Sequence, residues 1–233
     1  FLLLFFAAKL AAQDITYLSY TYFHLEAGPA AVKSIESNTV NLPVDHRYAI
    51  GGSLFAILGH RYNKHFALET GVGFQFLPLE QRSRLLRFGC DGPAPTPASS
   101  YVDASIEYIT LSIPLAARIY LSPATTGLYL RPTTIFNFSL GSEATADLYE
   151  CGAEEERMIN AGPIASEPFF LQVGGGIGYE FSGHDARAGY LEIYLSSSLG
   201  KIITFQEDPL SLEFLDDASA LMLGIKCGWQ IGG

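Results

Sequence analysis

The sequence is poor in charged residues, and acidic residues outnumber basic ones. Asp, Glu, Lys and Arg make up 16% of its 233 residues, against about 25% in an average soluble domain. The formal net charge is −10. Because phosphate binding needs basic patches, this composition argues against a nucleic-acid partner.

Long apolar runs are also missing beyond the N-terminus. No run of 18 or more apolar residues occurs there, which excludes a helical membrane span in that part of the chain. The first residues, FLLLFFAAKLAAQ (1–13), look like the remnant of a secretory signal peptide with an Ala-Gln cleavage site. A short buried strand or helix is the alternative. We expect a single domain over 14–233 that leaves the cytoplasm.

The sequence is rich in residues that favour strands and turns, with 23 Gly, 16 Phe and 13 Tyr. Apolar residues alternate with small or polar ones in repeated stretches such as YITLSIPLAARIYL (108–121), which is the pattern of a β-strand with one apolar face. We predict eight strands at about 15–30, 47–60, 65–76, 108–121, 128–140, 169–181, 190–199 and 221–231.

The predicted connections alternate in length along the chain. Short ones follow strands two, four and six, and longer polar ones lie at about 31–46, 78–103, 141–167 and 200–217. Outer-membrane barrels have short periplasmic turns and long extracellular loops. The pattern therefore predicts an all-β, eight-stranded antiparallel up-and-down transmembrane β-barrel.

The less apolar strand face decides which side of this barrel faces outward. It is dominated by Gly, Ser, Thr, Gln and Tyr, with few charges, whereas a water-facing surface is usually far richer in Lys and Glu. A soluble, lipocalin-like barrel is the alternative. We predict an apolar face toward lipid and a narrow lumen filled by side chains. The predicted lumen polar network is Glu26, Glu69, Arg118, Arg131, Glu180, Glu192 and Lys226.

Two of the three cysteines are candidates for a disulfide. Cys90 and Cys151 lie in the second and third long connections, on the predicted extracellular side, where disulfides form. Two free thiols are the alternative. Cys227 lies among outward apolar residues of the last strand, and we expect it to face lipid.

No catalytic, metal or cofactor site is predicted. GGGIG (174–178) lacks the helix that a phosphate-binding loop requires, and inward glycines that relieve crowding explain it better. The five histidines have no ligand spacing with cysteines or carboxylates. The acidic run at 154–156 is either a solvated loop surface or a site for a cation.

The chain resembles a family of small outer-membrane β-barrel proteins of Bacteroidetes-type bacteria, called PorT-like and related in architecture to OmpA-type barrels. The resemblance rests on LETGVGFQF, YITLSIPLAARIYL, LYLRPTTIFNFSLGS, FFLQVGGGIGYEF, YLEIYLSSSLGKI and ALMLGIKCGWQ, in this order over about 14–231. It implies an outer-membrane location and a part in secretion or envelope assembly. It supplies no catalytic residue. The segment after Trp229, QIGG, departs from the aromatic terminus common in such chains.

These observations favour a non-enzymatic cell-envelope protein: a closed barrel that acts as a structural or accessory subunit, with the lipid bilayer and other outer-membrane or secretion proteins as partners. A small porin-like channel for hydrophilic solutes is the alternative, because the inward face carries small residues. An outer-membrane enzyme would need a nucleophile and a base near the rim, and the sequence offers no such pair.

Overall fold

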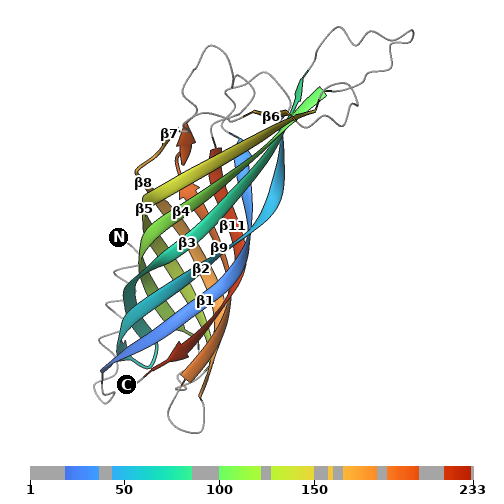
Figure 1. Cartoon of the computed structure of the whole chain (residues 1–233). Coiled ribbons are helices and arrows are strands. Elements are labelled where there is room, and N and C mark those ends of the chain that lie inside the picture. Colours follow the sequence, from blue (N-terminus) through green and yellow to red (C-terminus); the bar gives the residue numbers. More distant parts are fainter. Residues whose placement is uncertain are drawn as a thin grey trace, which may run out of the picture.

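The computed structural model shows a closed antiparallel β-barrel (Figure 1). It describes residues 19–36, 44–85, 100–121, 127–149, 157–159, 165–182, 188–204 and 218–231. Residues 1–13, Cys90, Cys151 and the acidic run at 154–156 lie outside these ranges, so the predictions made for them stay predictions. No helix in the described ranges is long and apolar enough to cross a membrane.

Eight strands form the wall of the barrel. They are β1 (Tyr20–Glu36), β2 (Val44–Asn63), β3 (Phe66–Leu85), β4 (Ser100–Tyr120), β5 (Gly127–Tyr149), β8 (Phe169–Ser182), β9 (Ala188–Leu199) and β11 (Ala218–Gln230). Each pairs with its neighbour, and β1 pairs with β11 to close the ring. The predicted fold class is confirmed.

Three short strands lie beyond the long-connection end of the wall. They are β6 (Arg157–Ile159), β7 (Ala165–Ser166) and β10 (Ile203–Thr204). Strand β6 adds to the end of β5, whereas β10 joins β7 to the start of β11.

The strands are longer than the sequence pattern predicts. The ladder between β3 and β4 continues to Leu85↔Ser100, and that between β4 and β5 to Tyr101↔Tyr149. Much of the segments 31–46, 78–103 and 141–167, predicted as polar connections, is therefore strand. The apolar alternation fades there, because the outward side chains become polar at positions such as Glu80 and Glu107 while backbone pairing continues. In Figure 1 the ends of β3, β4 and β5 rise toward β6.

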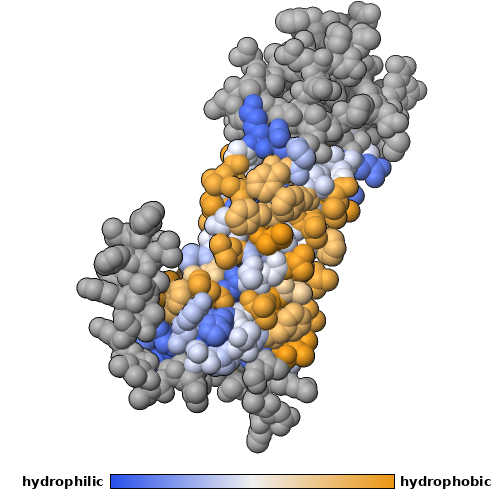
Figure 2. Space-filling view, turned by 90° about the vertical axis from the view of Figure 1, so that its left-hand side faces the viewer, coloured by the Kyte–Doolittle hydropathy of each residue, from blue (hydrophilic) through white to orange (hydrophobic). Residues whose placement is uncertain are grey.

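The apolar strand faces point outward, as predicted. Ile109 is 48% exposed and Leu115 is 52% exposed, whereas Arg118 is 2% exposed and Glu180 is 5% exposed. On the face shown in Figure 2, many apolar side chains lie over the middle of the barrel, and hydrophilic residues lie toward both ends. A surface of this kind suits hydrocarbon better than water.

Aromatic side chains mark both ends of this apolar belt. Phe169 and Phe181, the two ends of the outward row of β8, are both exposed. At a rise of about 3.4 Å per residue and a tilt of about 40°, the distance between them along the barrel axis is about 30 Å. That height matches the hydrocarbon core of a bilayer, which is about 30 Å thick.

Candidate functional site: the barrel lumen

Each of the eight wall strands contributes one buried charged residue to the lumen. In strand order these are Glu26, Arg61, Glu69, Arg118, Arg131, Glu180, Glu192 and Lys226. They place four carboxylates against four cations, so the lumen network is neutral. Burying a charge without a partner costs free energy. Equal numbers of carboxylates and cations lower this cost only if the opposite charges are in contact.

Arg131 joins three carboxylates from different strands. Its Nη1 lies 2.8 Å from Glu26 Oε2, and its Nε lies 2.7 Å from Glu69 Oε2. Nη1 also lies 3.6 Å from Glu192 Oε1. The planar guanidinium has five N–H donors in a fixed arrangement, which suits several carboxylates at once.

Arg118 makes the second strong set of contacts. Its Nη2 lies 2.9 Å from Glu69 Oε1, and its Nη1 donates to Glu180 Oε2 at 2.8 Å. The guanidinium carbon lies 4.5 Å from the centre of the Tyr129 ring and 4.6 Å from that of Tyr190. The cation is therefore held by two carboxylates and two aromatic faces.

Two ion pairs cross the full width of the lumen. Glu26 on β1 meets Arg131 on β5, and Glu180 on β8 meets Arg61 on β2, with 3.8 Å between Arg61 Nη1 and Glu180 Oε1. In each pair the two strands lie four places apart in the eight-membered ring, so they stand opposite each other. The charged side chains therefore block the lumen at this level.

Tyrosine hydroxyls complete the coordination of the carboxylates. Tyr22 OH donates to Glu69 at 2.7 Å, Tyr120 OH to Glu180 at 2.7 Å and Tyr129 OH to Glu192 at 3.0 Å. Tyr190 OH donates to Glu26, which also has Lys226 Nζ at 3.4 Å.

The structure brings together all seven charged residues that the sequence assigned to the lumen. It adds Arg61, His24 and the four tyrosines. Arg61 lies in the short connection that the sequence predicts after the second strand, which ends at about 60, yet β2 continues to Asn63. The inward parity of Phe55 and Ile57 extends to Arg61 and would have identified it. His24 Nε2 lies 3.6 Å from Glu26 Oε2.

Arg61 closes the end of the lumen near the short turns, which we call the inner mouth. Its side chain is fully buried, and its guanidinium carbon lies 3.8 Å from the centre of the Tyr120 ring. Its Nη2 donates to the carbonyl of Lys64 at 2.9 Å and its Nε to that of Asn63 at 3.2 Å. Arg61 thus ties the lumen network to the turn between β2 and β3.

An apolar plug fills the half of the lumen toward the long connections, which we call the outer half. Its buried members come from six wall strands and one connection: Ala30, Val32, Leu77, Leu79, Ile106, Tyr108, Phe170, Tyr194, Ile202, Ala220 and Met222. Ile202 is the member that no wall strand supplies. Gly200, with φ of 86°, turns the chain after β9, and a φ in this range favours glycine.

Glycines on the inward face leave room for the rings of the adjacent strands. Gly228 pairs with Tyr190 and Gly178 pairs with Glu192 and Tyr129. A Cβ at Gly228 would lie 2.1 Å from the Tyr190 ring, and one at Gly178 would lie 2.3 Å from that of Tyr129. The inward glycines of β8 thus have the role predicted for GGGIG.

We expect Gly228→Ala to destabilise the barrel by about 1–3 kcal/mol, the usual cost of overpacking a core. The added methyl group would displace Tyr190, which donates to Glu26. Urea unfolding in lipid vesicles measures the change. Gly141→Ala is the matched control, because a Cβ at Gly141 has no atom within 4 Å. Equal stabilities of the two variants would contradict the prediction.

No protein-family model matches the chain, and no curated protein matches it either. Solved structures are similar over most of its length. Ail, the attachment invasion locus protein of Yersinia pestis, crystallised with the heparin analogue sucrose octasulfate, is 11% identical with a TM-score of 0.39, covering 91% of this chain and 99% of Ail. Neisserial surface protein A is 14% identical with a TM-score of 0.39, covering 90% and 97%. The outer membrane protein OprG from Pseudomonas aeruginosa is 12% identical with a TM-score of 0.38, covering 94% and 100%. Likeness at this level carries no argument about function.

Proposed function

We propose that the protein is a closed, non-enzymatic barrel of the bacterial outer membrane, which acts as a structural or accessory subunit of the cell envelope. The observation that carries the proposal is the filled lumen: ion pairs cross the inner half and an apolar plug fills the outer half. The apolar belt with its aromatic ends supports the membrane location.

The part of the molecule beyond the belt supports an accessory role. Strands β3, β4 and β5 continue past the apolar belt as a paired sheet, to which β6 adds. A barrel with a blocked lumen can act mainly through its ends, and at one end this hydrogen-bonded sheet provides a surface. We infer that it presents a surface to other outer-membrane or secretion proteins, the role that the PorT-like resemblance implies.

The alternative, a channel for hydrophilic solutes, gives a different result in one experiment. We expect purified protein in planar bilayers to show no steady conductance, because crossing ion pairs and the apolar plug occupy the lumen. Proof of insertion comes from protease protection of the same preparation. Steady conductance of the inserted protein would contradict the closed-barrel proposal and favour the channel.

The Cys90–Cys151 disulfide remains a proposal. Both residues lie in connections on the side of the long loops, and a bond between them would lower the entropy cost of ordering these loops. Cys227 is exposed on the outward face of β11 and has no disulfide partner among the described residues.

A further inference from the structure

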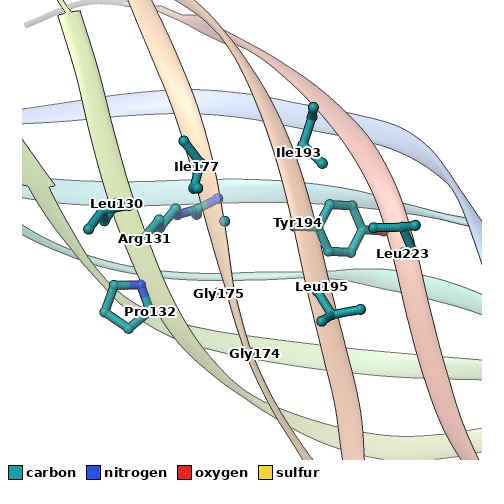
Figure 3. Close-up of a pocket in the computed structure, with 11 residues that line it drawn as sticks. Leu130, Arg131, Pro132, Gly174, Gly175, Ile177, Ile193, Tyr194, Leu195 and Leu223 are labelled. Carbon is teal, nitrogen blue, oxygen red and sulfur yellow. The ribbon is translucent and has the colours of Figure 1, made fainter.

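The outer surface of the barrel has a hollow at half the height of the apolar belt. It has a volume of about 580 Å³ and lies over β5, β8, β9 and β11 (Figure 3). Its floor is the backbone of the glycine run at 174–176. The outward side chains around it are apolar: Leu130, Pro132, Ile177, Ile193, Leu195 and Leu223. Arg131 and Tyr194 also line it, but both are buried residues of the lumen face.

The arrangement of the strands explains why the surface is hollow here. Pro132, Gly175, Leu195 and Leu223 form one row across the four strands, because each pairs with the next in register. Gly175 has no side chain and Pro132 has a compact one. The neighbouring row, from Leu130 through Ile177 to Ile193, stands higher and forms a wall.

The packing of the barrel does not require a glycine at the centre of this hollow. A Cβ at Gly174 would lie 2.3 Å from Leu195 O, and one at Gly176 would lie 2.5 Å from Glu192 Oε1. Both of these glycines face inward and are needed there. A Cβ at Gly175 would have its nearest neighbour, Arg131 O, at 3.7 Å, which is an ordinary contact. The hollow is therefore a feature of the outer surface and is not a by-product of lumen packing.

The position of the hollow limits what can occupy it. Gly175 lies halfway between Phe169 and Phe181, the aromatic ends of the belt on β8, and hence near the middle of the bilayer. This inference rests on the proposed membrane location. At that depth polar ligands are excluded by the cost of desolvation, and the hollow is continuous with the lipid-facing surface.

We propose that the hollow holds the terminal part of a lipid acyl chain. An apolar chain in the hollow gains dispersion contacts with the glycine floor and with the aliphatic side chains around it, which are more contacts than a flat barrel surface would give it. Membrane lipid surrounds the hollow at high concentration, so weak binding suffices for occupancy. The barrel thus carries a chain-end site at the bilayer centre.

The test uses the full chain in vesicles with phosphatidylcholine that is spin-labelled either near the chain terminus or near the carbonyl. Gly175→Leu places a branched apolar side chain at the centre of the hollow. We expect it to lower the motionally restricted fraction of the terminal label by the equivalent of a single chain per barrel, and to leave the carbonyl-proximal label unchanged. Gly175→Ala should give a smaller reduction, and it also serves if the leucine variant folds poorly. Gly141→Leu makes the same change at an exposed position outside the hollow and should have no effect.

An unchanged terminal label in a folded Gly175→Leu barrel would overturn the proposal. The proposal would also be overturned if Gly175→Leu changed the association state of the barrel in sedimentation experiments. The occupant of the hollow would then be a second copy of the chain. If the wild-type protein did not float with vesicles, the membrane location would be refuted. This result distinguishes a failure of the proposed membrane location from a failure of the proposed acyl-chain site.

Discussion

Replacement of Arg131 by methionine is expected to lower the free energy of unfolding by about 3–5 kcal/mol, the cost of removing one partner from a buried ion pair. Arg131 is 1% exposed and lies within 2.8 Å of oxygen atoms of both Glu26 and Glu69. Its loss leaves the buried Glu26 without its nearest cation and deprives the buried Glu69 of one of its two arginine partners. Urea unfolding in vesicles, followed by the fluorescence of the single tryptophan, Trp229, gives the value.

Two further variants make this result specific. Arg47→Met removes an arginine whose side chain is 40% exposed and lies 3.9 Å from Asp103, and exposed pairs of this kind contribute at most about 1 kcal/mol. The double variant Arg131→Met/Glu69→Gln should recover part of the lost stability, because it removes one of the unpaired charges. An Arg131→Met barrel as stable as the Arg47→Met barrel would show that the network does not hold the barrel together.

The second large effect is expected from a charge on the outer face. Ile177→Arg places a cation near the middle of the belt, where the cost is about 2–4 kcal/mol. Phe181→Arg, on the same face of β8 at the end of the belt, should cost about 0–1 kcal/mol. Both side chains are exposed, at 57% and 45%, so neither change disturbs the lumen.

Unfolding in vesicles and the fraction of folded protein after insertion measure this difference. The comparison separates a lipid-facing surface from a water-facing one, because an exposed arginine in water has little cost at either position. Equal stabilities of the Ile177→Arg and Phe181→Arg proteins would contradict the membrane location of this belt.

Much of the wall of the barrel could be predicted from the sequence, because the alternation of side chains along a strand directly encodes its two faces. The parity of Arg118, Glu180 and Glu192 placed them inward without any structure. The ends of the strands could not be predicted in this way. Beyond the belt the outward faces of β3 and β4 become polar, at Glu80 and Glu107 for example, so the apolar outward row that marks a strand of the belt is missing although pairing continues.

The partners within the lumen were also beyond the reach of the sequence. Parity shows that Arg131 and Glu26 both face inward, but their meeting depends on the stagger between strands on opposite sides of the ring. Arg61 was missed because a polar strand end resembles a turn. The Tyr190–Gly228 pair likewise follows from cross-strand register, which residue type alone does not fix.

The neutrality of the lumen determines where the charge of the whole molecule lies. With four carboxylates balanced by four cations inside, the net charge of −10 belongs to the remainder of the chain. The connecting segments 86–99, 150–168 and 200–217, which all leave the same end, contain eleven acidic and three basic residues. Neighbouring copies in a membrane would therefore repel each other at that end over a Debye length of about 8–10 Å, and raising the ionic strength on that side would weaken this repulsion.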